Sequence, residues 1–303
     1  MALAHLVWPD DRGATPQWRA ADHAALRAAL GVLFQLLLIV CAALLYFGVR
    51  GLTQGSESAA VAHARDLLHL ERALGIDVEA SLQRDVLEHR WMINIVNWVY
   101  MWGHWPVIAV TLFMLYARRR RTYVVLRNAM FISGAIGLVI FATYPVAPPR
   151  LLPPGSGFID TVTQWSTSYR VLQPPSLVNK YAAMPSLHAG WNLLVGIALW
   201  HAFTSKRVRA FAVASPLLMA FAVVATANHY VIDAIAGAAL SLVGLVASIV
   251  LLQWADRRGI DLTALELPAW GRRSRSGDGR GDLEAVDDHH VDADRVQSEG
   301  LFH

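Results

Sequence analysis

The chain has 303 residues, of which 55% are hydrophobic, with a mean hydropathy of +0.38 and a net charge of +3. So apolar a composition excludes an ordinary soluble domain and indicates a protein that crosses a membrane several times. The small net charge gives no indication of a nucleic-acid partner. The single cysteine, Cys41, cannot form an intramolecular disulfide, and its place in an apolar run is typical of a small residue facing lipid or another helix.

A helix needs about 20 mostly apolar residues to span a bilayer. Six stretches of the chain approach this length: residues 29–49, 91–116, 124–144, 187–204, 208–227 and 230–252. The fourth and fifth stretches are shorter than the strongest ones and are joined tightly through "TSKRVR". The sequence therefore predicts an all-α integral membrane protein, with a bundle of about six transmembrane helices over residues 29–252.

The connecting stretches differ from one another in composition. Residues 51–90 are polar, and their apolar positions recur at the spacing of an amphipathic helix that lies on the membrane surface. These positions are Ala64, Leu67, Leu68, Leu70 and Leu74. Residues 145–186 are rich in proline, glycine and serine, which predicts an ordered but irregular loop. The polar residues 253–303 predict a disordered tail, in which His289 and His290 are solvated rather than bound to a metal.

Arginine clusters predict the orientation of the helices. The densest are "ARRRRTY" at 117–123 and "SKRVR" at 205–209, and other arginines precede the first segment and follow the sixth. The positive-inside rule places all of them on the cytoplasmic side of the cell membrane, together with residues 1–28 and the C-terminal tail. The stretches 51–90 and 145–186 then lie on the outer face.

This orientation places two histidines at the same membrane level. His188 begins the fourth segment and His229 begins the sixth, so both are expected at the outer face. On a helix, His229 and Asp233 are four residues apart and share one face. A carboxylate there can fix the imidazole tautomer and leave the other ring nitrogen as an oriented base or nucleophile. The alternative is a purely structural His–Asp hydrogen bond at a helix start, which the presence of His188 at the same level makes less favoured.

Groups suited to an anion lie in the loop before His188. Arg150 ends the proline-rich "YPVAPPR", Lys180 lies eight residues before His188, and Ser186 stands where the fourth helix begins. Arginine binds phosphoryl oxygens through two parallel hydrogen bonds, lysine supplies a point charge, and the first N–H groups of a helix attract phosphate. We interpret these three residues as phosphate-binding, with Arg170 as a weaker candidate. The alternative for Arg150 and Lys180 is that they reach toward lipid headgroups.

Polar and small residues also recur within two of the apolar segments. Asn97, Tyr100 and His104 form a polar stripe in the second segment, which either lines a pocket for a lipid substrate or joins helices by hydrogen bonds. Small residues of the sixth segment are typical of close helix packing: Gly237, Ser241 and Gly244.

The motifs "PSLHAGW" and "NHYVIDAIAG" resemble the second and third signature motifs of the type 2 phosphatidic acid phosphatase superfamily. They are most similar to the branch that contains fungal inositol phosphorylceramide synthase, whose members also carry an "APP" segment upstream. The likeness covers about residues 140–240, and the six-segment pattern extends it over most of the chain.

The resemblance implies a reaction and a role for each residue of the pair of motifs. His229 would attack phosphorus to form a phosphohistidine, His188 would protonate the leaving oxygen, and Asp233 would orient His229. No metal or other cofactor takes part. The implied substrate is a lipid phosphate or phospholipid in the bilayer. The phosphoryl group then passes from the histidine to water in a phosphatase, or to an alcohol such as inositol in a phosphotransferase.

The chain departs from the superfamily pattern at the phosphate-binding residues. The first motif of the superfamily, with its Lys and Arg-Pro, has no counterpart here, and Val223 occupies the place of an arginine six residues before the nucleophile. The phosphate-binding role therefore falls to Arg150 and Lys180.

Two other classes of protein compete with this interpretation. A transporter would carry ionisable groups near the middle of the bilayer, whereas the main ionisable cluster here is expected at one edge. A metal-dependent hydrolase could use His188, His229 and Asp233 as ligands, because two histidines and a carboxylate bind iron or zinc.

Overall fold

The computed structural model describes residues 21–52, 55–165, 179–260 and 262. Across these residues the secondary structure is helical, and the only strand-like feature is a parallel bridge between Val146 and Ala182. The helices are α1 (Ala21–Leu52), α2 (Glu57–Leu74), α3 (Glu79–Leu87), α4 (Arg90–Trp102), α5 (Trp105–Arg118), α6 (Arg120–Thr143), η1 (Pro149–Leu151), α7 (Thr161–Trp165), α9 (Leu187–Ala202), α10 (Lys206–Ala225) and α11 (Val231–Arg257). The predicted all-α class is confirmed.

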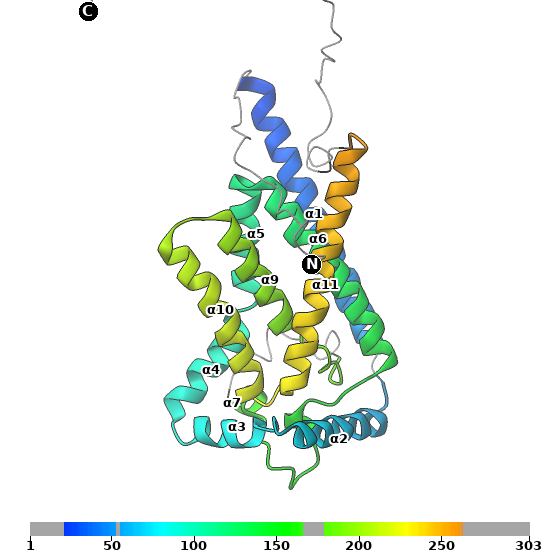
Figure 1. Cartoon of the computed structure of the whole chain (residues 1–303), viewed down its shortest axis with the longest axis vertical. Coiled ribbons are helices and arrows are strands. Elements are labelled where there is room, and N and C mark those ends of the chain that lie inside the picture. The colour runs from blue at the N-terminus through cyan, green and yellow to red at the C-terminus, as the bar shows by residue number, and fades with distance from the viewer. Residues whose placement is uncertain (1–20, 53–54, 166–178, 261, 263–303) are drawn as a thin grey trace, which may run out of the picture. The chain divides into compact units, whose positions relative to one another are not determined.

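Several of these helices have the length and composition of membrane spans. In the described part of the chain, α1, α6, α10 and α11 each qualify, and α4 and α5 qualify together as a fifth, bent span. Figure 1 shows these long helices running side by side, while α2 and α3 lie across one end of them. The chain is therefore a multi-pass membrane protein.

The span predicted over 91–116 consists of two helices joined by a bend, and not of one helix. The axes of α4 and α5 differ by 44° at the break between them. Pro106 lies in the first turn of α5, where its missing N–H costs nothing, but in a continuous helix it would remove a hydrogen bond and clash with the preceding turn. At the break, a Cβ atom on Gly103 would lie 2.4 Å from the carbonyl oxygen of Val99, so this tight turn requires glycine.

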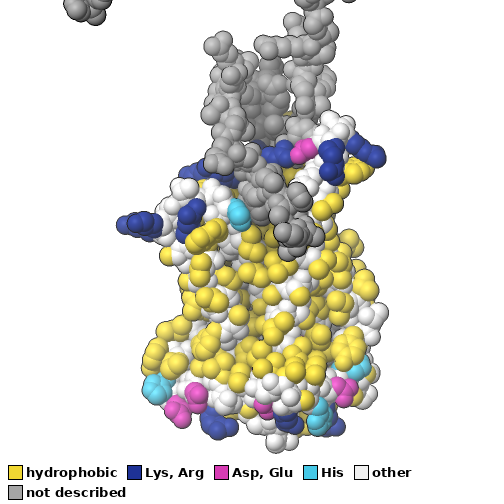
Figure 2. All heavy atoms as spheres, in the orientation of Figure 1, with side chains coloured by type: hydrophobic (Ala, Val, Ile, Leu, Met, Phe, Trp, Pro, Cys, Tyr) yellow, Lys and Arg dark blue, Asp and Glu magenta, His cyan; other side chains and the backbone are white. Residues whose placement is uncertain are grey.

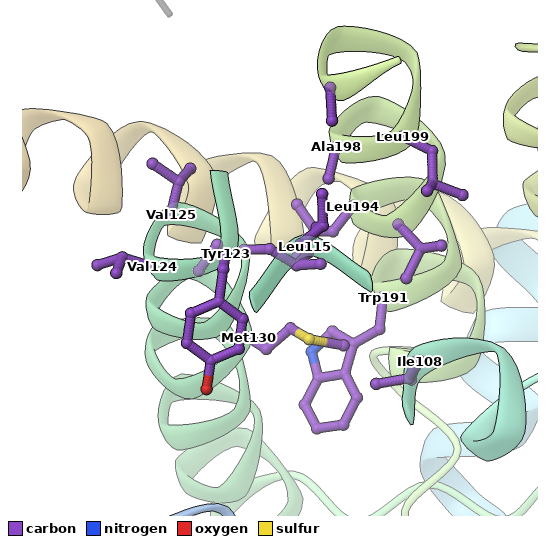
Figure 3. Close-up of a cluster of buried hydrophobic side chains, with 14 of the residues drawn as sticks. Ile108, Leu115, Tyr123, Val124, Val125, Met130, Trp191, Leu194, Ala198 and Leu199 are labelled. Carbon is purple, nitrogen blue, oxygen red and sulfur yellow. The ribbon is translucent and has the colours of Figure 1, made fainter. Parts of the chain in front are cut away.

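The central helix of the bundle is α9. Its 16 residues extend about 24 Å, less than the roughly 30 Å of a hydrocarbon core. It packs against α5, α6, α10 and α11, and most of its side chains are buried. Figure 3 shows side chains of three helices meeting in this core: Trp191, Leu194, Ala198 and Leu199 from α9, Tyr123, Val124, Val125 and Met130 from α6, and Ile108 and Leu115 from α5.

The exterior has an apolar belt between two polar ends. On the face that Figure 2 shows, yellow side chains cover the middle, and dark blue ones lie at both ends, with more of them at the upper end. At that end Arg119 donates to the carbonyl of Ala202, Arg209 donates to the carbonyl of Phe203, and Arg121 pairs with an aspartate of α11. We name it the arginine-rich end, and the opposite one the α2–α3 end. On α1, Cys41 is exposed among apolar side chains, as expected for a lipid-facing residue.

The polar insert folds differently from the single amphipathic helix expected over 51–90. Gly75, with a positive φ of 68°, ends α2, and α3 begins four residues later. The expected apolar face was also wrong in part, because Leu70 and Leu74 are exposed. The buried face of α2 instead consists of Ala60, Ala64, Leu67 and Glu71. The insert therefore places a carboxyl group against the bundle.

Candidate active site

The start of α9 is packed directly against the start of α11. Ser186 caps α9, its hydroxyl accepting a hydrogen bond from the N–H of Ala189, and its own N–H donates to the carbonyl of Asp233 at 2.9 Å. A Cβ atom on Gly237 would lie 2.0 Å from the carbonyl oxygen of Ser186, so only glycine permits this approach. A Cβ atom on Gly244 would lie 2.6 Å from the carbonyl oxygen of Ala129 on α6. The small residues of α11 thus serve packing, and they bring the two histidine-bearing motifs together.

The side chains of His188 and His229 face each other across this junction. Their ring centroids are 6.0 Å apart and their planes differ by 50°. The Nδ1 atom of His229 lies 2.7 Å from the carbonyl oxygen of Ala183. Because a carbonyl can only accept, Nδ1 carries the proton and Nε2 holds the unshared electron pair. His229 thus has the tautomer of a nitrogen nucleophile.

Asp233 supports His229 from behind. One of its carboxylate oxygens lies 3.5 Å from Nδ1 of His229 and accepts the N–H of Tyr230 at 2.9 Å. The side chain is completely buried and lies outside the group of residues that line the cavity described below. Asp233 therefore contacts the ring of His229 and not the cavity, while the carbonyl of Ala183, which was not foreseen, makes the shorter contact.

Two further buried carboxyl groups hold the first turn of α11. The N–H of Val231 donates to Glu79 at 2.9 Å, and that of Ile232 donates to Glu71 at 2.8 Å. Burial and the neighbouring Glu79 raise the pKa of Glu71 to about 8. Together with Asp233, these groups satisfy N–H donors that a helix start leaves open. Neither glutamate was foreseen from the sequence, because the N–H groups that they accept from lie more than 150 residues away along the chain.

His188 lies against two rings from the bend of α4 and α5. Its ring centroid is 4.8 Å from that of Tyr100 and 4.2 Å from that of His104. The Nδ1 of His104 accepts a hydrogen bond from the side-chain amide of Asn192 at 3.0 Å. The third residue of the expected polar stripe, Asn97, instead exchanges hydrogen bonds with Thr161 of α7. The bend thus directs two residues of the stripe toward His188 and one away from it.

Arg150 is held in place by residues of the loop and of the α10–α11 turn. Its Nε donates to Asn228 at 2.8 Å, and one terminal nitrogen donates to Asp160 at 2.9 Å. The backbone N–H of Arg150 donates to the carbonyl of Ala227, which ties the loop to the residues just before His229. Lys180 is exposed at the mouth of the same region. Asn228 and Asp160 were not foreseen, although Asn228 immediately precedes His229 in the motif.

A cavity of about 560 Å³ connects these groups. Its polar lining consists of Arg150, Asn179, Lys180, His188, Asn228 and His229, together with Tyr100 and His104. Its apolar lining includes aromatic residues of α1, α5 and α9. Of the expected site residues, Asn97, Asp233 and Ser186 lie outside this lining, and Arg170 lies outside the described residues. The arrangement suits an anion at one end and an apolar group at the other.

A family model described as the PAP2 superfamily matches residues 65–247, well over half of the chain. The chain belongs to the PAP2 superfamily. No curated protein and no solved structure matches the sequence. The matched range runs from α2 to α11 and includes both histidines, whereas α1 precedes it.

PAP2 superfamily membership supports a phosphatase-type activity on lipid phosphates. The histidines and carboxylates also bear on the metal-dependent alternative. Within the described residues, no group of three or more histidine, cysteine, aspartate and glutamate side chains could hold a metal ion. Asp233 instead contacts the Nδ1 side of the His229 ring.

Proposed function

We propose that this PAP2 superfamily protein cleaves the phosphoester of a membrane lipid phosphate through a phosphohistidine on His229. The observation that carries the proposal is the hydrogen bond from Nδ1 of His229 to the Ala183 carbonyl, because it fixes the unshared pair on Nε2. The proposed site lies at the outer face of the cell membrane, as the positive-inside rule predicts.

The reaction has two steps. Nε2 of His229 forms a bond to phosphorus while the bond to the leaving oxygen breaks, and His188 gives that oxygen its proton. The carboxylate of Asp233 stabilises the positive charge that develops on the imidazole. A second nucleophile then attacks phosphorus, its proton passes to His188, and the phosphorus–nitrogen bond breaks. Covalent catalysis divides the barrier, and proton donation of this kind contributes about 10²–10⁴-fold.

Charge on the phosphoryl oxygens is stabilised by the cations of the cavity. Arg150 is oriented by Asn228 and Asp160, and Lys180 stands at the mouth. Fixed donors in a site sheltered from water are worth more than the same donors in solution. These residues therefore take the place of the phosphate-binding residues that the first superfamily motif supplies elsewhere.

Transfer to an alcohol is the second candidate for the final step. It is supported by the resemblance of "PSLHAGW" and "NHYVIDAIAG" to the inositol phosphorylceramide synthase branch. The cavity volume of about 560 Å³ is also within the range of sites for drug-sized ligands, so it accommodates an acceptor beside the phosphate. Inositol is the alcohol that the resemblance favours.

The proposal is tested with radiolabelled lipid phosphates and phosphodiesters. We expect wild-type protein to release phosphate, to acquire a transient label, and to remain active after treatment with a chelator. His229→Ala should acquire no label. A new labelled product that forms only with inositol would identify a transferase. Turnover that requires a metal, or an unchanged label on His229→Ala, would contradict the mechanism.

A further inference from the structure

Two apolar grooves open on the side of the helix bundle. One, of about 270 Å³, lies between α1, α5 and α6. The other, of about 720 Å³, is lined mainly by α9, α10 and α11. The smaller groove shares Tyr46, Trp105 and Trp191 with the catalytic cavity, whereas the larger one shares no lining residue with it. The smaller groove therefore adjoins the catalytic cavity, whereas the larger one does not, although it offers more room.

We propose that the groove between α1, α5 and α6 binds one hydrocarbon chain of the lipid substrate while its phosphate lies between His188 and His229. This inference rests on the proposed function and specifies where the substrate's apolar part is held. It assigns the role to α1, a helix that precedes the range matched by the PAP2 superfamily model.

Trp191 lies where the catalytic cavity and the smaller groove adjoin, because it lines both. Trp191 lies three residues after His188 on α9, and its ring is stacked with that of His104 at 6.0 Å. Trp105 and Tyr46 approach the same indole at 5.9 Å and 6.0 Å. Its N–H donates to Ser133 at 3.1 Å, so the polar atom is satisfied within the protein. The faces and edges of these rings are left to contact an apolar chain.

Polar side chains lie at the far end of the groove. Along α6 the lining extends from Leu138 to Arg127, eleven residues or about 16 Å. There Arg127 donates to the side chain of Gln35 at 2.8 Å, and Tyr123 donates to the same oxygen at 2.7 Å. The volume is below the roughly 300–1,000 Å³ of sites for drug-sized ligands, which suits a single chain.

Filling the groove from two sides tests the inference. Ala42→Trp on α1 and Ala135→Trp on α6 place a large side chain in the groove, while Ala220→Trp places the same side chain in the larger groove as a matched control. Activity is measured on a long-chain lipid phosphate and on a small soluble aryl phosphate. We expect the first two variants to lose about tenfold or more in kcat/KM on the lipid alone, and the control to lose neither activity.

A photoreactive long-chain alkyl phosphate, with its reactive group at the chain end, provides a second measurement on unaltered protein. Labelling should fall on peptides of α1, α5 and α6. Labelling of α10 or α11, or full lipid activity in both groove variants, would overturn the inference. If wild-type protein hydrolyses neither the lipid nor the aryl phosphate, the proposed function fails instead.

Discussion

At the scale of single residues, the two central histidines differ in what holds them. His229 has a fixed proton on Nδ1, donated to a backbone carbonyl, and a carboxylate 3.5 Å away. His188 lies against rings, stacked on Tyr100 and beside His104. A nucleophile needs a fixed tautomer, whereas a proton donor needs access to the leaving oxygen. The difference in environment therefore matches the difference in proposed role.

Substrates with different leaving groups should separate these roles. A general acid matters for an alkoxide but little for a nitrophenolate, which leaves without a proton. His188→Ala should therefore lose about 10²-fold or more on an alkyl phosphate and much less on nitrophenyl phosphate. His229→Ala should be inactive on both, as steady-state assays of purified protein would measure. The reverse pattern would exchange the two assignments.

Asp233→Asn provides the internal control for this comparison. The Ala183 carbonyl still fixes the tautomer in this variant, so only the stabilising charge is lost. We expect a reduction of about 10–100-fold on both substrates, which corresponds to the roughly 1.5–3 kcal/mol of a hydrogen bond to a charged group. Complete inactivity on both would mean that the carboxylate, and not the carbonyl, sets the tautomer.

At the scale of elements, the site depends on contacts that the sequence indicates only in part. The small residues of α11 were readable because glycine and serine at helical spacing have few other uses in a membrane helix. The bend before α5 was also encoded, by Gly103 and Pro106, but the apolar run around them obscured it. Glu71 and Glu79 were unreadable as site residues, because their partners are N–H groups more than 150 residues away.

The buried Glu71 predicts a dependence of stability on pH. Its pKa is raised from 4.5 to about 8, so between these values the folded protein holds a proton that the unfolded chain has released. The free energy of unfolding then falls as pH rises through this window, by at most about 1.4 kcal/mol per pH unit. Glu79 and Asp233 are the other acidic groups that face Glu71.

The matched pair of variants for this prediction is Glu71→Gln and Glu88→Gln. Glutamine keeps an oxygen for the N–H of Ile232 but takes up no proton. The melting temperature of detergent-solubilised Glu71→Gln should therefore change less between pH 5 and pH 8 than that of the wild type. We expect the two slopes to differ by a few degrees per pH unit. Glu88 is exposed, and its variant should follow the wild type. Parallel curves for all three proteins would contradict the prediction.

At the scale of the whole molecule, the helix count and the irregular connections were the hardest features to predict. Composition indicates membrane spans because a bilayer tolerates few charges. The helix α9, however, has only 16 residues, fewer than the about 20 that a span needs. Its place at the centre follows from its packing against four neighbouring helices. By contrast, the gathering of arginines at one end follows from the order of the segments alone.

The orientation in the membrane is tested with single cysteines in a Cys41→Ala background. Ser156 lies exposed in the loop over 145–186, and Ser205 lies exposed at the arginine-rich end. In intact cells an impermeant thiol reagent should label Ser156→Cys and leave Ser205→Cys unlabelled until the membrane is opened. The opposite labelling would place the site on the cytoplasmic side.

The hydrogen bonds from the first turn of α11 to Glu71 and Glu79 have a consequence for biogenesis. Chains are made from the N-terminus, so both glutamates are synthesised long before their partners. Ile232, for example, follows Glu71 by 161 residues. Until the last helix inserts, the two carboxyl groups have no N–H partners from it, and His229 does not yet exist. Assembly of the site therefore waits for the final crossing of the membrane. A ribosome that stalls before α11 leaves an inserted protein that contains His188 and Arg150 but lacks His229.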